Sequence, residues 1–207
     1  MIVRLGVALA AAVLYTGLGL AVSHVPPFGI DVAGRALAGE APHLALLFTE
    51  SCWWPALVVW GVVAIFVAGR FPVWRPRVTY AIPTMLVAWQ VSDFLKNVFH
   101  RPRPEYWRLI HEPTFSYPSG HAMFAVLVYG LWAWFLWRSD LPRAVRCVVA
   151  PLATLWACGV IWSRLALGAH YVTDVIGGVL LATCALAFAA AIHAAVSRRL
   201  TGASVRS

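Results

Sequence analysis

The sequence predicts an all-α membrane protein, a polytopic bundle of six transmembrane helices that forms a single domain over residues 1–207. Of its 207 residues, 61% are hydrophobic and only 12% are charged, whereas a soluble domain is about half apolar and about a quarter charged. The mean hydropathy is +0.77. Six apolar stretches are close to the roughly 20 residues that cross a bilayer as a helix. The loops between them contain most of the arginines.

The six expected spans cover approximately residues 4–23, 51–69, 79–99, 121–138, 147–163 and 173–196. The first span also resembles a signal peptide, because Arg4 precedes its apolar run and Ala21-Val22-Ser23 resembles a cleavage site. Its apolar run, residues 5–22, is longer than the usual signal core, which favours a retained helix. The other five spans are the same under either interpretation.

Two connecting segments are long. Residues 24–50 begin with a proline pair and contain a mildly amphipathic portion, 31–48. This pattern fits a helix on the membrane surface and an irregular loop equally well. Residues 100–118 contain four prolines, which predict an ordered loop or broken turns rather than a continuous helix.

The distribution of arginines predicts the orientation, because cytoplasmic loops are enriched in Lys and Arg. With a cytoplasmic N-terminus, that side carries ten cations and a single acid, Asp140; the cations are Arg4, Arg70, Arg75, Arg77, Arg138, Arg143, Arg146, Arg198, Arg199 and Arg206. The opposite side carries six cations and most of the acids; its cations are Arg35, Lys96, Arg101, Arg103, Arg108 and Arg164. We therefore expect both termini in the cytoplasm and the polar clusters described below at the outer face of the membrane; the abundance of Arg and Ala further suggests a bacterial protein, hence an inner membrane.

The net charge of +8 comes mainly from these loop arginines, so we expect no nucleic-acid partner. The cysteines, Cys52, Cys147, Cys158 and Cys184, lie within or at the start of apolar runs and show no metal-binding spacing. They are expected to be small core residues rather than a disulfide or zinc framework.

The first of three polar clusters lies at the outward end of the third span. Lys96 ends that span, and Arg103 lies between two prolines, which keep its backbone extended and allow its side chain to point back toward the helix end. An ammonium and a guanidinium placed there would bind a tetrahedral oxyanion. Ordinary snorkelling of basic side chains explains the pair equally well. Arg101, also followed by proline, competes with Arg103 for the role.

The second cluster, Pro118-Ser119-Gly120-His121, opens the fourth span. The free N–H groups of a helix N-terminus bind anions, and glycine lets a ligand approach the backbone closely. His121 is suited to donate a proton to a leaving oxygen near neutral pH. The alternatives are that Ser119 is only an N-cap and that His121 is structural.

The third cluster brackets the turn between the last two spans: Ser163-Arg164, His170 and Asp174. His170 and Asp174 are four residues apart, which places them on one face of a helix. A carboxylate on one imidazole nitrogen leaves the other as a basic nucleophile. A buried His–Asp hydrogen bond with a structural role is the alternative, but ionisable residues near membrane depth favour function.

Together the clusters supply three cations, backbone donors, an acid histidine and an oriented histidine. No acidic cluster suited to Mg²⁺ or Zn²⁺ accompanies them, so we expect no metal and no cofactor. Positive side chains would then neutralise the phosphoryl charge, and the predicted chemistry is metal-independent phosphoryl transfer.

These clusters resemble all three signatures of the type 2 phosphatidic acid phosphatase family, membrane lipid phosphatases related to the vanadium haloperoxidases. The resemblance covers residues 96–174 and extends to the flanking Phe115-Ser116-Tyr117 and Leu167-Gly168-Ala169-His170-Tyr171. It implies six membrane helices with the active site at the outer face.

By resemblance, His170 is the nucleophile that forms a phosphohistidine, Asp174 orients it, and His121 is the general acid and later the base. The resemblance also implies a phosphate-binding set, formed by Lys96, Arg103, Arg164, Ser119 and the Gly120 amide. Asp93 either positions Lys96 or caps the helix at the interface. Other polar residues of the loop over the site have no assigned role: His100, Glu105, Arg108, His111, Glu112 and Tyr117.

The resemblance implies hydrolysis of a terminal phosphate on a membrane lipid such as undecaprenyl diphosphate, phosphatidylglycerol phosphate, phosphatidic acid or lipid A phosphate. Undecaprenyl diphosphate or a broad substrate range is weakly favoured, because the chain has little room for a headgroup domain. One alternative is a lipid phosphotransferase that uses the same phosphohistidine. Another is a non-catalytic lipid binder or transporter, although the intact histidines and Asp174 disfavour it.

Overall fold

The computed structural model describes residues 1–105 and 109–204, with side chains described as far as residue 196. The described residues form helices, turns and loops, which confirms the all-α prediction. The elements are α1 (Ile2–Ser23), α2 (Gly29–Gly34), η1 (Arg35–Leu37), α3 (Pro42–Glu50), α4 (Trp54–Arg70), η2 (Pro72–Trp74), α5 (Arg75–Phe99), α6 (Gly120–Phe124), η3 (Ala125–Gly130), α7 (Leu131–Trp137), α8 (Arg143–Ala166) and α9 (Val172–Ser204).

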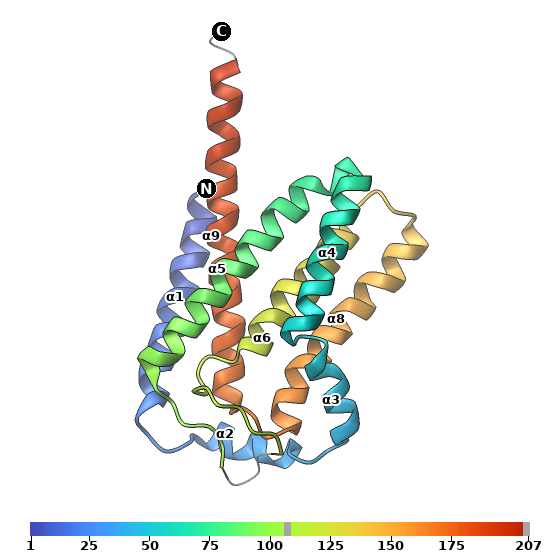
Figure 1. Ribbon diagram of the computed structural model, residues 1–207. Coiled ribbons are helices and arrows are strands. Elements are labelled where there is room, and N and C mark those ends of the chain that lie inside the picture. Colours follow the sequence, from blue (N-terminus) through green and yellow to red (C-terminus); the bar gives the residue numbers. More distant parts are fainter. Residues whose placement is uncertain (106–108, 205–207) are drawn as a thin grey trace.

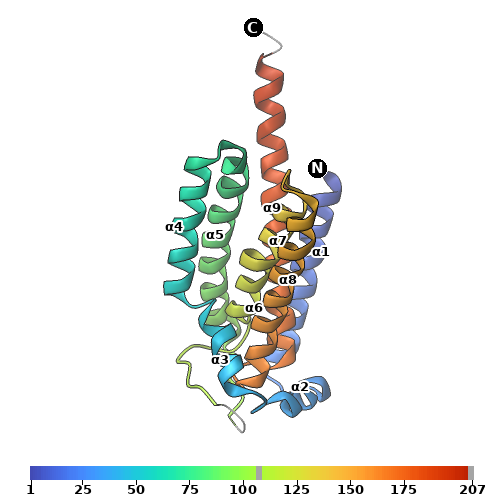
Figure 2. The same cartoon turned by 90° about the vertical axis from the view of Figure 1, so that its right-hand side faces the viewer.

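The long helices lie roughly side by side in one bundle (Figure 1). Both termini lie at one end of the bundle, and α2, α3 and the loop that follows α5 lie at the other. A quarter turn shows α4 and α5 as a pair on one side, with α1, α8 and α9 on the other (Figure 2). Large hydrophobic side chains are exposed along the helices, including Leu9, Val63, Phe66 and Leu155, as expected for surfaces that face lipid.

Each of the six expected spans is helical, but not all of them qualify as membrane spans by length and composition. Among the described residues, four helical stretches do: Ile2–Ser23, Gly120–Trp137, Arg143–Ala166 and Val172–Val196. The pair α3 and α4, bent by 47°, makes a fifth if it is one span. Helix α5 is not among them, since it begins with two arginines and carries Asp93 and Lys96 near its end.

The fourth expected span is one rod with an irregular middle. Helix α6 passes into the π-helical segment η3, which continues as α7. Helix α5 begins at Arg75, before the expected start at residue 79, and α9 continues past residue 196 to Ser204. Both extensions contain arginines, so they form helix but do not belong to the apolar runs from which the spans were predicted. Arg206 lies outside the described residues, and so does Arg108.

The two long connections have different structures. Most of residues 24–50 is helical, in the short pieces α2, η1 and α3, so the segment is not an irregular loop, and its placement on the membrane surface stays a prediction. Positive φ angles at Gly39 and Ala41 separate η1 from α3. In the other segment, residues 100–105 and 109–118 contain no helix, which confirms the predicted loop for the part that is described.

The cysteine prediction is correct only in part. All four cysteines are free, but only Cys52 is buried, while Cys147 and Cys158 are exposed. Apolar runs predict that a residue lies in a span, yet they do not reveal which face of the helix points toward lipid. The expectation that all four are core residues is therefore wrong.

Two adjacent glycines bring α9 close to the start of α6. A Cβ atom at Gly177 would lie 2.3 Å from the ring of Tyr117, and one at Gly178 would lie 2.4 Å from the carbonyl oxygen of Ser119. Tyr117 stacks on Tyr15 of α1, with ring centroids 5.3 Å apart, and its hydroxyl donates to the Tyr15 carbonyl oxygen. This packing fixes the second polar cluster against the last helix.

Candidate active site

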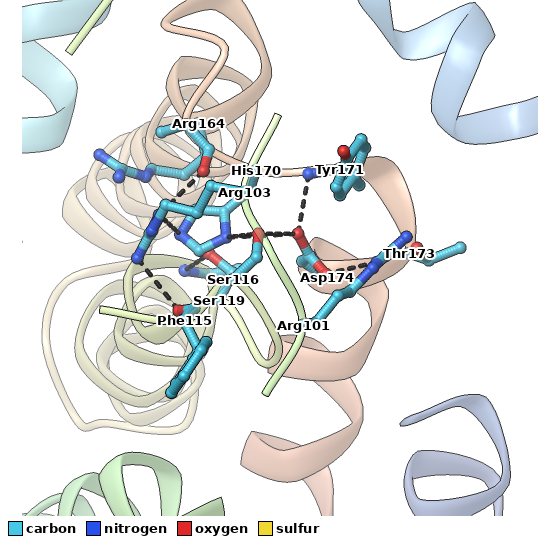
Figure 3. A network of polar contacts seen from close by, with 12 residues as sticks. Arg101, Arg103, Phe115, Ser116, Ser119, Arg164, His170, Tyr171, Thr173 and Asp174 are labelled. Atoms are coloured by element: carbon cyan, nitrogen blue, oxygen red, sulfur yellow. Dashed lines mark hydrogen bonds and ion pairs between the residues drawn. The ribbon is translucent and has the colours of Figure 1, made fainter. Parts of the chain in front are cut away.

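The three polar clusters meet at the end of the bundle that lies opposite the termini. The loop after α5, the N-terminus of α6 and the turn between α8 and α9 converge there (Figure 3). Residues separated by more than 60 positions in sequence, such as Arg103 and His170, are in direct contact. The helices thus assemble one polar centre from the separate motifs.

His170 lies in the turn between α8 and α9 and is 2% exposed. Its Nδ1 atom is 3.5 Å from the Asp174 carboxylate, and its Nε2 atom is 3.1 Å from Nη1 of Arg103. A guanidinium only donates hydrogen bonds, so Nε2 accepts from Arg103 and the imidazole proton is on Nδ1. The lone pair of Nε2 therefore faces the Arg103 side chain.

Asp174, in the first turn of α9, is fully buried. Its Oδ2 atom accepts hydrogen bonds from the Ser116 hydroxyl and from the Tyr171 backbone N–H, the latter at 2.9 Å. Its Oδ1 atom accepts from Arg101. These donors fix the orientation of the carboxylate beside the imidazole (Figure 3).

Arg103 is held in place by the loop that follows it. Its Nε donates to the carbonyl oxygen of Thr114 at 2.6 Å, and Nη2 donates to that of Phe115 at 3.2 Å. Nη1 also donates to the carbonyl oxygen of Ala169 at 2.8 Å. The guanidinium is therefore fixed beside His170 before any ligand binds.

Arg164, in the last turn of α8, is the second buried guanidinium. It donates to the Thr49 hydroxyl and to a carboxylate oxygen of Glu112. The other Glu112 oxygen lies 2.8 Å from Nη2 of Arg103. One carboxylate therefore bridges both arginines.

The electrostatics of Glu112 and His170 follow from this arginine pair. Burial alone would raise the pKa of Glu112, but the guanidiniums of Arg164 and Arg103 lower it to about 2. Burial, followed by the positive charges of Arg103 and Arg164, lowers the pKa of His170 well below its usual 6.5, and Glu112 offsets this only in part. At neutral pH Glu112 is thus an anion, and His170 is an uncharged base.

The N-terminus of α6 lies next to this network. The Ser119 side chain accepts a hydrogen bond from the Ala122 N–H at 3.4 Å, as an N-cap does, and the Ser119 N–H donates to the Asp174 carbonyl oxygen at 3.0 Å. A Cβ atom at Gly120 would lie 3.9 Å from the Lys96 ammonium. Lys96 also lies 3.9 Å from Asp93 and 3.4 Å from the Thr114 hydroxyl.

A mostly apolar cavity of about 560 Å³ reaches the edge of this network, where Lys96, Glu112, Gly120 and His121 line it; His170, Asp174, Arg103 and Arg164 are not in its lining. Successive turns of α4 and α5 line most of it, including Leu57, Ile65 and Leu86. Near the end of α5, the lining becomes polar and consists of Asp93, Lys96, Glu112, Gly120 and His121. An amphiphile with a long apolar chain and an anionic head would match this lining.

The structure places all eight sequence-predicted site residues around this centre. His170, Asp174, Arg103 and Arg164 form one contact network that includes Glu112, and the Ser119 backbone is bonded to Asp174. Lys96, Gly120 and His121 line the same cavity as Glu112. Arg101, the rival of Arg103, contacts Asp174 rather than His170.

Sequence reasoning missed several partners of these residues. Glu112 was noticed without a role, and Ser116 was noticed only as a flanking residue. Thr49, Thr114 and Asp31 were not noticed. A single sequence contains no signal for these, because each acts through a contact across more than ten positions. No group of three His, Cys, Asp or Glu side chains in the described part of the chain is arranged to hold a metal ion.

Comparison with known proteins identifies relatives of this chain. A family model described as the PAP2 superfamily matches residues 77–198. Phosphatidylglycerophosphatase B of Escherichia coli is 34% identical, over 84% of this chain and 86% of its own length. Phosphatidylglycerophosphatase B of Bacillus subtilis is 41% identical, but the match spans only 42% of this chain and 44% of that protein.

The fold also resembles a solved structure. The crystal structure of a transmembrane PAP2 type phosphatidylglycerolphosphate phosphatase from Bacillus subtilis superposes with a TM-score of 0.74 and 24% sequence identity. The superposition covers 91% of this chain and 96% of that one. It shows that the helical arrangement described above is shared.

Proposed function

Since the chain belongs to the PAP2 superfamily, we propose that it is a membrane lipid phosphatase that works through a phosphohistidine at His170. The observation that supports this most is the orientation of His170. Its Nε2 accepts a hydrogen bond from Arg103, which the phosphoryl group would have to replace, and its other nitrogen faces the buried carboxylate of Asp174. An oriented, uncharged imidazole beside fixed cations is the arrangement that nucleophilic attack on a phosphoryl group requires.

The proposed reaction has two steps. Nε2 of His170 attacks phosphorus, the bond between phosphorus and the leaving oxygen breaks, and His121 protonates that oxygen. His121 then takes a proton from water, whose oxygen attacks phosphorus and breaks the phosphorus–nitrogen bond, so that inorganic phosphate is released. Asp174 stabilises the imidazolium that forms in the first step.

Positive charge replaces a metal ion in this proposal. The guanidiniums of Arg103 and Arg164 and the ammonium of Lys96 would bind the phosphoryl oxygens, together with Ser119 and the Gly120 N–H. Glu112 already bridges the two arginines, so the substrate phosphate must displace its carboxylate. Binding is then an exchange of one anion for another.

The mostly apolar cavity supports a lipid substrate. Its lining of Leu, Ile, Val and Trp side chains along α4 and α5 suits acyl or prenyl chains that enter laterally from the bilayer. Of the four expected lipid classes, phosphatidylglycerol phosphate is favoured by the names of the relatives. This revises the initial preference for undecaprenyl diphosphate.

We further propose that the chain crosses a bacterial inner membrane six times as one domain, with α5 as the third span. Both termini would then be cytoplasmic and the site would face outward. The separation of the termini from the site along the bundle and the arginine distribution support this orientation.

The first test is phosphate release by purified protein in detergent with EDTA. Substrates would be phosphatidylglycerol phosphate, undecaprenyl diphosphate, phosphatidic acid and a lipid A phosphate, with His170→Ala and the exposed control His193→Ala. We expect release that His170→Ala abolishes and His193→Ala retains. Phosphorylated acceptor lipid without free phosphate would indicate a transferase. No turnover by the wild type, or loss of turnover with EDTA, would overturn the proposal.

Asp174→Asn gives a second test of the same site. An amide keeps the size of the side chain but cannot stabilise an imidazolium, so we expect kcat to fall by about 10³- to 10⁴-fold while KM changes little. Thr183→Val, in the same helix but away from the site, serves as the control. An unchanged kcat would reduce the His170–Asp174 pair to a structural contact.

A further inference from the structure

The most unusual group outside the described machinery is a buried chain of charges behind Asp174. Arg101 is 3% exposed and lies between two buried carboxylates, Asp174 and Asp31. Nη1 of Arg101 contacts Oδ1 of Asp174, and Nη2 is 2.7 Å from Oδ2 of Asp31. Asp31 belongs to α2, the short helix after the first span.

Asp31 is in turn fixed by the start of α9. Its Oδ1 accepts from the backbone N–H of Thr173 at 2.9 Å, and the Thr173 hydroxyl lies 2.9 Å from both of its oxygens. That hydroxyl also accepts from Arg101 at 2.6 Å. The Tyr171 ring lies under the guanidinium, 4.3 Å from its carbon. Both terminal nitrogens of Arg101, both oxygens of Asp31 and the Thr173 hydroxyl thus bind other members of the cluster.

The two oxygens of Asp174 have separate partners. Oδ2 faces His170, Ser116 and the Tyr171 amide, while Oδ1 is held by Arg101. Rotation of the carboxylate about its last torsion would exchange these oxygens, and Arg101 opposes that rotation. Because Asp31 binds the other arm of the fork, the plane of the guanidinium is itself fixed.

We propose that Arg101 and Asp31 are positioning residues for the reaction, forming a relay that sets the orientation of the Asp174 carboxylate toward His170. The proposal rests on the proposed function of His170 and Asp174. A role in stability alone explains the cluster poorly, because buried ion pairs are often no more stabilising than apolar packing. The relay also makes the Asp174 carboxylate dependent on α2, the short helix after α1.

The test is single-turnover hydrolysis of the preferred lipid, with enzyme in excess and saturating. Partial misfolding lowers the amplitude of such a reaction, whereas a positioning defect lowers its rate constant. We expect Arg101→Met to lower the rate constant by roughly 10- to 100-fold, by analogy with the loss when outer-shell partners of metal-binding histidines are removed, with the amplitude retained. Arg101→Lys, which keeps the charge but not the fork, should recover part of this loss.

Asp31→Asn completes a cycle with Arg101→Met. If Asp31 acts through Arg101, Asp31→Asn slows the wild type but has no further effect in the Arg101→Met background. Arg70→Met and Asp140→Asn, which are exposed and lie at the other end of the bundle, should match the wild type. Should Arg101→Met fail to purify as folded protein, Arg101→Lys and Asp31→Asn alone decide the question.

Three outcomes would overturn the inference. An Arg101→Met or Asp31→Asn rate constant within twofold of wild type removes the residue concerned from the relay. Equal slowing by Asp31→Asn in both backgrounds shows that Asp31 does not act through Arg101. If the wild type itself shows no turnover while remaining folded, the proposed function fails and the relay falls with it. If instead the wild type turns over its substrate and His170→Ala abolishes this turnover, the proposed function holds, and a normal rate in the relay variants counts against the relay alone.

Discussion

Glu112 illustrates how the role of a residue depends on its contacts rather than its type. In the sequence it is one of several polar residues in a proline-rich loop. In the structure its carboxylate bridges Arg103 and Arg164, the two guanidiniums proposed to bind phosphate. It is ionised at physiological pH because those cations lower its pKa to about 2. Glu112 therefore competes for the site with the anion that the site is proposed to bind.

Glu112→Gln should strengthen inhibition by inorganic phosphate and by vanadate. In this variant the two arginines bind an uncharged amide, which an incoming anion displaces more easily than a carboxylate. The difference of about 1.5 kcal/mol corresponds to roughly tenfold tighter binding of phosphate or vanadate. Inhibition constants measured with the same lipid substrate would show this. Glu105→Gln, an exposed position in the same loop, serves as the control. An unchanged or weaker inhibition would show that Glu112 does not compete.

The lowered pKa of His170 predicts that its ring stays neutral in mildly acidic solution. A histidine of the unfolded chain is half protonated near pH 6.5, but burial and the neighbouring arginines keep His170 uncharged well below that value. As pH falls below about 6.5, the unfolded chain therefore binds the proton first, and the contribution of His170 to the free energy of unfolding decreases.

Nitrogen NMR of ¹⁵N-histidine-labelled protein would check this, with His170→Ala used to assign the signal. We expect the His170 signal to remain that of a neutral ring at pH 6. A His170 signal that changes to that of a protonated ring between pH 7 and pH 6 would contradict the electrostatic argument.

At the scale of elements, close approach of helices assembles the site. The start of α6 contacts α9 where the chain has two glycines, and a side chain at Gly178 would meet the Ser119 carbonyl oxygen and Ala122. Ser119 is part of the Pro118-Ser119-Gly120-His121 motif. The position of the motif relative to His170 therefore depends on a residue with no functional group.

Gly178→Ala should displace the start of α6 and lower both activity and stability. Overpacking of this kind costs about 1–3 kcal/mol, and a shift of the motif by a fraction of an ångström should reduce kcat by more than tenfold. Thermal unfolding in detergent and kcat would both be measured. Gly6→Ala is the matched control, since nothing lies within 4 Å of a Cβ atom there. Equal behaviour of the two variants would show that the close approach is unimportant.

At the scale of the whole molecule, the open question is how many helices cross the membrane. Helix α5 has the least apolar composition of the long helices, because it carries Arg75 and Arg77 at its start and polar residues such as Asp93 and Lys96 near its end. The proposed topology needs it as the third span. Its length of 25 residues is sufficient for this, since a helix rises about 1.5 Å per residue.

Fusions to a reporter that is active only outside the cytoplasm would test the topology. We expect activity after Ala38 and Thr114, and no activity after Pro72 and Asp140. If α5 did not cross, the fusion after Thr114 would be inactive and the sign of every later fusion would reverse. The assay therefore decides the third span separately from the others.

The sequence by itself determined the helical class, the approximate limits of the apolar helices and the residues of the three motifs. These are local properties, since hydrophobic runs and proline positions act over a few residues. The four-residue spacing between His170 and Asp174 predicted their contact but not its setting, since His170 lies in the turn before α9, which begins at Val172, and not on the helix face that the spacing indicated. The resemblance to a family then connected the motifs to one chemistry.

Only the tertiary structure decided which cation faces which anion. Arg101 and Arg103 are two residues apart, both precede proline, and are equivalent in the sequence, yet one contacts Asp174 and the other His170. The choice depends on partners such as Asp31, which pairs with Arg101, and Glu112, which pairs with Arg103. The exposure of Cys147 and Cys158 was decided in the same way. Which side chains are buried and which charges pair depends on how the helices pack against one another. Partners on different helices have no characteristic separation in the sequence, so a single sequence does not reveal them.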